Sequence, residues 1–182
     1  MSEDNETVTF LLRVDGSTNF YRNWTEYKSG FGDIDRGGFW LGLDDLHHLT
    51  YSKPYGLEVH LADWDLHVYR AMYRYIVVGP ESDNYPLTVS GYNTKSNAGN
   101  CLQHHNNNEF TTYDNDNDKW ANDSNCAASY MGGWWYGACA WANPTGLYLT
   151  NGTGNIRAIF WWLAKDSYYS MKYTRYTLVP RK

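Results

Sequence analysis

The 182-residue sequence has no long apolar run, few cysteines and few basic residues, and these shortages exclude several classes of protein. No stretch reaches the roughly 18 apolar residues that a membrane-spanning helix needs. Lys and Arg total 15 against 20 Asp and Glu, and no basic run could follow a phosphate backbone, so nucleic acid is excluded as the expected partner. The start "MSEDNETVTF" is acidic and polar, so no signal peptide is predicted within this chain.

Aromatic residues, in contrast, are abundant, because Tyr, Trp and Phe make up 18% of the chain. The hydrophobic fraction of 42% and the length fit one globular domain with a substantial core. Aromatic rings either pack in such a core or stack on ligands, and several of them gather between residues 130 and 141. We expect core packing to dominate there, with Trp134 and Trp135 inside.

Alternation of apolar residues predicts a first half rich in strands. Strands are expected at 7–15, 57–65, 67–79 and 87–92, with a closing strand at 168–180. Ser17 or Thr18 is expected to cap a helix that Gly30 ends, and a second short helix is predicted at 42–50. Residues 96–154 show no periodicity, and a segment of that length predicts a functional region or one tied down by other contacts.

The cysteines favour a disulfide over a metal site. Cys126 and Cys139 enclose a short aromatic loop, and no second cysteine or suitably spaced histidine completes a zinc pattern. Closing about fourteen residues would stabilise the fold by roughly 3 kcal/mol in the chain-entropy model. Such a bond persists in oxidising compartments, and the Asn-x-Ser/Thr sequons are compatible with secretion. Cys101 is left as an odd thiol, expected to be a buried small residue.

An acidic run precedes the first of these cysteines, with aspartates at the alternate positions Asp114, Asp116 and Asp118. An EF-hand loop is excluded, because its sixth and twelfth positions would be Lys119 and Asn125. In an extended segment Asp116 and Asp118 point the same way and can present hard carboxylate oxygens to one cation, which favours calcium. The alternative interpretation is a solvated acidic turn with side chain to backbone hydrogen bonds.

Longer motifs resemble a known family. The run "FTTYDNDNDKW…NCAASYMGGWWYGAC", followed by "ANPTGLYL" and "YYSMKYTRYTLVP", resembles the fibrinogen C-terminal (fibrinogen-related) domain, and "RVDGSTNFYRNWTEYKSGFG…FWLGLDDLHHLT" is similar to its middle region. The resemblance runs from about Arg13 to Pro180. It implies an α+β fold with a central twisted antiparallel sheet, short flanking helices and a long irregular subdomain for calcium and ligand.

The same resemblance implies how one domain at 7–182 is organised. The central sheet and helices would occupy about 7–95, the calcium and ligand-pocket subdomain about 96–160, and the closing strand about 161–180. The family's first segment, with its own cysteine pair, is absent before Thr7. We therefore expect either a fragment or a sheet that closes differently at that edge.

The resemblance also assigns site residues. Calcium would be bound by Asp116 and Asp118 together with the carbonyl groups of Trp120 and Asn122. Cys126 would pair with Cys139.

A small ligand pocket would border that disulfide. The bond between Ala138 and Cys139 would be a cis peptide that lines the pocket, with Tyr130 and Ala140 beside it. Lectin-like members hold an acetyl group in this pocket and carry histidine where this chain has Ala140. The substitution removes a polar contact and weakens the expectation of acetyl binding.

Two functions follow from the resemblance. The first is a secreted, extracellular, calcium-binding recognition module that binds acetylated carbohydrate, as in innate-immune lectins. The second is a module that binds a protein ligand without sugar binding, as in fibrinogen or angiopoietin-type proteins. No catalytic motif is present, and His104 and His105 are expected to be surface or structural residues, so an enzyme is not expected. Oligomerisation would use a segment absent here.

Overall fold

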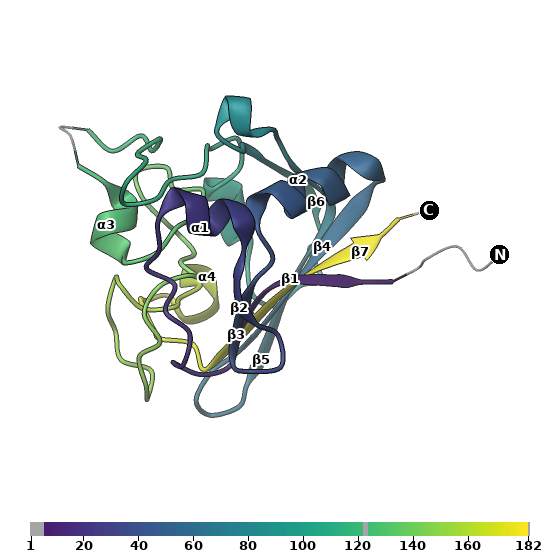
Figure 1. Ribbon diagram of the computed structural model, residues 1–182. Coiled ribbons are helices and arrows are strands. Elements are labelled where there is room, and N and C mark those ends of the chain that lie inside the picture. Colours follow the sequence, from purple (N-terminus) through teal and green to yellow (C-terminus); the bar gives the residue numbers. More distant parts are fainter. Residues whose placement is uncertain (1–5, 122–123, 182) are drawn as a thin grey trace.

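A seven-stranded antiparallel sheet forms the centre of the computed structural model, which describes residues 6–121 and 124–181 (Figure 1). The strand order is β2-β3-β1-β7-β4-β5-β6. The strands are β1 Val8–Arg13, β2 Phe31–Asp33, β3 Gly38–Trp40, β4 Tyr55–Ala62, β5 Val68–Val78, β6 Leu87–Tyr92 and β7 Tyr173–Pro180. The last strand, β7, pairs with both β1 and β4, so the end of the chain completes the middle of the sheet.

Alternation along the central strands decides which face of the sheet is covered. In β4, Leu57, Val59 and Leu61 are buried, whereas Glu58 and His60 on the opposite face are half-buried. The neighbouring strands continue the pattern, since Val59 pairs with Tyr176 in β7 and with Ala71 in β5, and both are buried. The predicted strands at 57–65, 67–79 and 87–92 are therefore present with small shifts at their ends.

Two helices cover the inner face, α1 Trp24–Ser29 and α2 Leu43–Ser52 (Figure 1). The predicted cap of the first helix is wrong. Asn23 caps α1 through a reciprocal capping box with Glu26. The Ser17 hydroxyl instead donates to Asp15 Oδ1 at 2.6 Å, so this residue stabilises a local turn ahead of the helix. Gly30 ends α1 as predicted, with a positive φ of 89°.

Aromatic side chains make up a large part of the core, as the composition predicts. Trp134 and Trp135 are each 1% exposed, and their rings meet edge to face with centroids 4.8 Å apart. Arg13 is buried beside this core, where its guanidinium donates to the carbonyl oxygens of Pro144 at 3.1 Å and Gly146 at 2.8 Å. Burial lowers the pKa of Arg13 to about 10. Its hydrogen bonds attach β1 to the irregular segment.

Residues 93–172 are largely irregular and carry the candidate site. Their short helices are η2 Cys101–His104, α3 Cys126–Tyr130 and α4 Trp162–Lys165, while η1 Glu81–Asp83 precedes β6. The predicted closing strand begins at Tyr173 and not at 168, because Tyr169 and Ser170 bond to other segments: the Tyr169 hydroxyl accepts from the Trp64 amide, and the Ser170 hydroxyl donates to the Leu149 carbonyl. In the described residues no helix has the length and apolarity to cross a bilayer.

Candidate functional site

The three alternating aspartates have different partners. Asp114 Oδ1 accepts hydrogen bonds from the backbone N–H of Trp24 at 2.9 Å and from the Thr112 hydroxyl at 2.7 Å. Asp114 therefore anchors the acidic loop to the start of α1 and is occupied. Asp116 Oδ1 accepts only from the Asp118 N–H among the described residues, at 3.2 Å, so its carboxylate stays available for a ligand.

Asp118 connects the acidic loop to the disulfide. Its Oδ1 accepts from the Trp120 N–H at 2.7 Å and its Oδ2 from the Cys126 N–H at 2.7 Å. Burial, and then the negative charge of Asp116, raise the pKa of the Asp118 carboxyl. Two hard carboxylates held close together, one of them partly desolvated, are a donor set that fits calcium. The fourth predicted ligand, Asn122, lies outside the described residues.

The disulfide between Cys126 and Cys139 is present, with Cα atoms 5.6 Å apart, and the Ala138–Cys139 peptide is cis. Both features agree with the sequence analysis. Cys101 is free and fully buried, and its sulfur accepts from the Leu163 N–H at 3.3 Å. Burial raises the pKa of this thiol to about 12.

A pocket of about 370 Å³ lies beside the disulfide. Its volume falls in the range of roughly 300–1,000 Å³ that is usual for small-ligand sites. All four residues predicted for a pocket line it, and the structure adds four that the sequence analysis did not place there. The full lining is His104, Tyr130, Ala138, Cys139, Ala140, Trp141, Trp162 and Tyr168.

His104 is the most important of the four added residues. We expected it to be a surface or structural residue, but it lines the pocket. Its ring stacks on Trp141, with centroids 5.3 Å apart and planes 4° from parallel. Its Nε2 atom is buried and has no hydrogen-bond partner among the described residues, and burial lowers the pKa of the ring. The imidazole thus reaches the pocket from η2, about 35 residues before Ala140, where the family's histidine was expected. No local motif around His104 predicts this placement.

His105, in contrast, holds the loop behind the pocket. Its Nε2 accepts from the N–H groups of Trp141 at 3.2 Å and Ala142 at 3.0 Å, so its Nδ1 carries the proton and donates to the Trp135 carbonyl at 2.8 Å. Burial lowers the pKa of His105 to about 3. The ring stays neutral and fixes the two residues that follow the pocket's Ala140.

The pocket itself is uncharged. None of its described lining residues carries a carboxylate, and burial, followed by the neighbouring Tyr168, raises the pKa of the Tyr130 hydroxyl to about 12. Tyr168 also packs edge to face on Trp162, with centroids 4.8 Å apart. Neutral aromatic walls with a few hydroxyl and imidazole groups suit a neutral or apolar ligand group.

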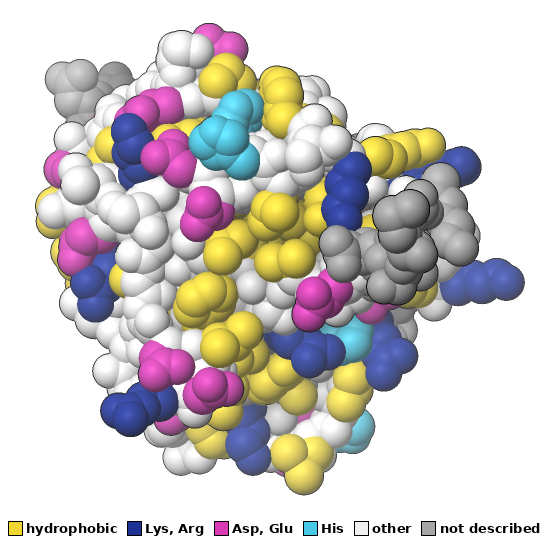
Figure 2. Space-filling model, turned by 45° about the vertical axis from the view of Figure 1, so that its right-hand side comes forward, with side chains coloured by type: hydrophobic (Ala, Val, Ile, Leu, Met, Phe, Trp, Pro, Cys, Tyr) yellow, Lys and Arg dark blue, Asp and Glu magenta, His cyan; other side chains and the backbone are white. Residues whose placement is uncertain are grey.

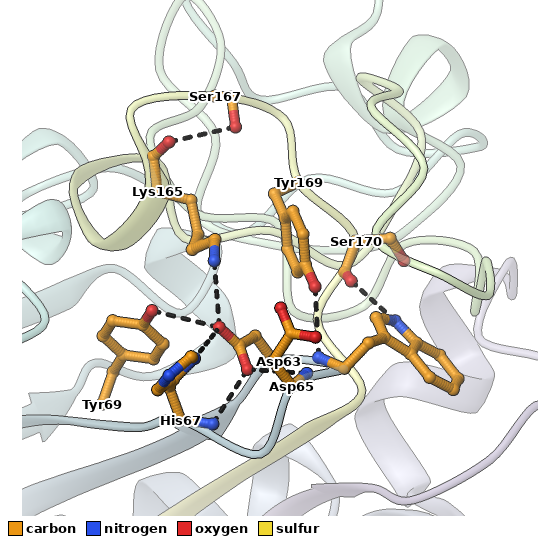
Figure 3. Close-up of polar contacts among 9 residues, drawn as sticks. Asp63, Asp65, His67, Tyr69, Lys165, Ser167, Tyr169 and Ser170 are labelled. Atoms are coloured by element: carbon orange, nitrogen blue, oxygen red, sulfur yellow. Dashed lines mark hydrogen bonds and ion pairs between the residues drawn. The ribbon is translucent and has the colours of Figure 1, made fainter.

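A second polar cluster lies at the β4–β5 turn (Figure 3). Ligand-type atoms of Asp63, Asp65 and His67 lie within 4.8 Å of one another. The buried Asp63 carboxylate is already saturated, because Oδ1 accepts from the N–H groups of Asp65 and His67 while Oδ2 accepts from His67 Nδ1, Tyr69 and Lys165. This cluster therefore joins the turn to α4. Asp63 was not among the predicted site residues, because no sequence motif marks it.

Comparison with known proteins agrees with this architecture. The family model described as the C-terminal globular domain of fibrinogen beta and gamma chains matches residues 1–181. Fibrinogen C domain-containing protein 1-A of Xenopus laevis is 38% identical over 96% of this chain and 38% of its own length. Angiopoietin-related protein 6 of Mus musculus is 39% identical over 88% of this chain and 35% of its own length. The chain thus spans less than half of these relatives.

Solved structures give the same result. The fibrinogen-like globe domain of human ANGPTL2 has a TM-score of 0.91 and 37% identity, and the alignment covers 100% of this chain and 83% of that one. Lamprey fibrin D-dimer in complex with the peptide Gly-His-Arg-Pro-amide has a TM-score of 0.91 and 31% identity, covering 100% of this chain and 64% of that one. The central sheet closed by the last strand, the disulfide and the motifs around it thus identify this chain as a member of the fibrinogen C-terminal domain family.

Proposed function

We propose that this domain is an extracellular, protein-binding module that receives one neutral or apolar anchor residue of a partner in the pocket beside the disulfide. The observation that carries the proposal is the pocket lining, in which aromatic rings and the imidazole ring of His104 surround an uncharged hollow. Aromatic-lined hollows with few polar groups are typical places for anchor residues. No catalytic step belongs to this function.

Calcium has a supporting role in the proposal. Asp116 and Asp118, with the carbonyl groups of Trp120 and Asn122, would hold the ion, which would compensate the repulsion between the two carboxylates. The hydrogen bond from the Cys126 N–H to Asp118 connects the calcium ligands to α3, so a bound ion would also hold α3 in place. This helix ends at Tyr130 in the pocket. The disulfide supports an oxidising, extracellular setting.

The pocket's neutrality also predicts a weak response to a basic peptide. The lamprey fibrin structure holds Gly-His-Arg-Pro-amide, whose amino terminus and arginine are cationic. The described pocket residues of this chain offer no carboxylate to pair with either group. We expect Gly-His-Arg-Pro-amide to bind at least tenfold more weakly than a peptide with an apolar or aromatic anchor.

Selection from a phage-displayed heptapeptide library tests the proposal. The wild-type domain would be the target, and selected peptides would be measured by calorimetry on Trp141→Ala and Tyr168→Ala, with Tyr51→Ala on α2 as a control for loss of an exposed aromatic side chain. The expected result is an apolar or aromatic consensus and a loss of affinity of about tenfold in the pocket variants only. Peptides that bind both pocket variants as tightly as the wild type would refute the pocket assignment.

N-acetylated sugars are the second candidate ligands, and one observation favours them. The His104 imidazole lines the pocket, in which Ala140 stands at the position expected to hold histidine. Such a site makes few contacts, so monomeric N-acetylglucosamine should bind weakly and His104→Ala should abolish the binding. Calorimetry with N-acetylglucosamine and glucose distinguishes this candidate, because equal heats for both sugars would exclude acetyl recognition.

A further inference from the structure

The outer face of the sheet, opposite α1 and α2, is lined by side chains of three adjacent strands. The register places Arg175 of β7, His60 of β4 and Arg70 of β5 in one row across the sheet. The next row contains Glu58 and Met72. This face shares no lining residue with the pocket beside the disulfide, so it offers a separate surface.

Positive charge is concentrated on this face although the chain has a net charge of −5. Four arginines from β5, β7 and the residue after β7 reach it, together with Lys95 after β6. They are Arg70, Arg74, Arg175 and Arg181. None of these five cations forms an ion pair with a carboxylate in the described part of the chain. In Figure 2, Lys and Arg side chains lie on either side of a histidine at the right of the view, next to acidic side chains.

Two of the arginine side chains, Arg181 and Arg175, are held by neighbouring groups without being neutralised. The Arg181 guanidinium donates to the Arg74 carbonyl at 2.5 Å and lies over the Tyr75 ring at 4.6 Å. The Arg175 guanidinium donates to His60 Nδ1 at 3.2 Å, which links the two side chains across the strands, and burial followed by the charge of Arg175 lowers the pKa of His60. Bracing by rings and carbonyls lowers the entropy that each side chain would lose on binding an anion.

Two hollows follow this cationic face. One, of about 640 Å³, is lined by Glu58, Met72, Arg74 and Arg181, and it lies over Gly56, which has no side chain to fill it. The other, of about 520 Å³, is lined by Arg70, Met72 and Lys95. Because Met72 borders both hollows, together they form one groove along β5 from Arg70 to Arg74, with the apolar Met72 at its midpoint.

We propose that this surface, the β5 groove, binds an extended acidic segment of a partner protein. Alternate residues of a strand lie on one face about 6.8 Å apart, so Arg70 and Arg74 stand roughly 13 Å apart with Met72 between them. An extended peptide has the same spacing, so acidic residues four positions apart reach both arginines. The peptide residue between the two acids should be apolar, because it would contact Met72 and because Glu58 would repel an acidic residue there.

Spacing also decides between a peptide and a sulfated polysaccharide. A polysaccharide would be attracted by the charges alone, and Glu58 would repel a sulfate group at the midpoint of the groove. A peptide with the pattern acidic, any, apolar, any, acidic avoids Glu58 and contacts Met72. The observations therefore favour the peptide.

The test is fluorescence anisotropy with a fluorescein-labelled peptide that contains Glu-Thr-Leu-Thr-Glu. The comparison peptides are Lys-Thr-Leu-Thr-Lys and the isomer Glu-Glu-Thr-Leu-Thr, and a sulfated heparin hexasaccharide serves as competitor. The double variant Arg70→Glu/Arg74→Glu should bind about tenfold more weakly, whereas Glu58→Gln should bind about threefold more tightly. Arg36→Glu, an exposed charge reversal on the β2–β3 turn, should change nothing.

Three results would overturn the proposal. The first is absence of binding at low ionic strength, where exposed charges act most strongly. The second is equal binding by the wild type and the double variant. The third is a combination of two observations: the two acidic isomers bind with equal affinity, and the hexasaccharide displaces the peptide when both are added at the same concentration of negative charge. This result would assign the face to sulfated glycans. Melting curves of each variant confirm that the exposed substitutions leave the fold intact.

Discussion

Asp118 Oδ2 accepts a hydrogen bond of 2.7 Å from the backbone N–H of Cys126, and this bond joins the acidic loop to the disulfide. Cys126 begins α3, whose last residue is the pocket's Tyr130. A change at Asp118 is therefore transmitted to the pocket through five helical residues and one covalent bond. The acidic loop and the candidate ligand site are one structural unit.

Calcium should stabilise the domain. Two carboxylates with neutral carbonyl ligands give an extracellular type of site, with a dissociation constant of roughly 10⁻⁴ to 10⁻³ M. At ten times that concentration the ion adds about 1.4 kcal/mol to the free energy of unfolding, which raises the melting temperature by a few degrees. Thermal melts in calcium and in chelator measure the shift.

Asp118→Asn provides the matched variant for the calcium prediction, because it keeps the size of the side chain and removes one charge. It should abolish the calcium-dependent shift, while Asp35→Asn in the exposed β2–β3 turn should keep it. A wild-type melt that is indifferent to millimolar calcium would return the acidic run to the interpretation of a solvated turn.

Much of the fold could be predicted because its signals are local. Alternation along β4, β5 and β6 defines the buried face, and Gly30 marks the end of α1. The helix start was missed, since Ser17 and Asn23 are both good capping residues and only the Asp15 turn decides between them. The short strands β2 and β3 were missed because three residues are too few for a period to show.

The site was predictable only where one motif contains its residues. Asp118, Cys126 and Tyr130 stand within a single run, so the family resemblance places them together. His104 and Tyr168 come from segments on either side of that run, and packing alone brings them to the pocket. Asp63 lies in no recognisable motif. It stabilises the turn because Lys165 of α4 and His67 of the same turn donate hydrogen bonds to its carboxylate.

Cys101 should be inert in the native protein. Its side chain is fully buried, and burial raises the pKa of the thiol to about 12, so the reactive thiolate is scarce at neutral pH. Iodoacetamide at pH 8 should leave the native protein unmodified and add one group after denaturation without reduction, as measured by intact mass. Modification of the native protein at the rate of free cysteine would contradict the buried position.

The stabilisation of the β4–β5 turn by Asp63 should be lost in acid. Burial alone would raise the pKa of its carboxyl, but hydrogen bonds from Lys165 and His67 outweigh it and hold that pKa well below its ordinary value. The contribution to stability is therefore complete above about pH 4 and is lost as the pH falls below it. Asp63→Asn should cost about 2–4 kcal/mol at pH 7, since it leaves charged and backbone donors poorly paired.

The neighbouring Asp65→Asn is the control for this prediction, because Asp65 is exposed and its substitution should change the stability by less than about 0.5 kcal/mol. Urea denaturation of both variants at pH 7 and pH 3 measures the effect. Asp63→Asn should differ less from the wild type at pH 3. An equal difference at the two pH values would show that the cost comes from packing and not from the charge.

His105 should remain neutral well below the pH at which an ordinary histidine is charged. Burial lowers its pKa to about 3, whereas the unfolded chain binds a proton near pH 6.5. Between these values the unfolded state holds more protons than the folded state, so stability rises with pH. From pH 8 to pH 5 this residue should account for a loss of about 2 kcal/mol. The Nδ1 proton should stay in place, because it donates to Trp135 while Nε2 accepts from Ala142.

Nitrogen-detected NMR of the histidine rings provides the measurement without a variant. The signals of His105 should keep the Nδ1–H tautomer and show no titration from pH 8 to pH 4, with exposed His48 as the internal control. Denaturation of His105→Gln supports it independently, since its stability should depend less on pH over this interval. A His105 ring that gains a proton above pH 5 would mean that the loop after Cys139 opens to water, and the pocket behind it would not be preformed.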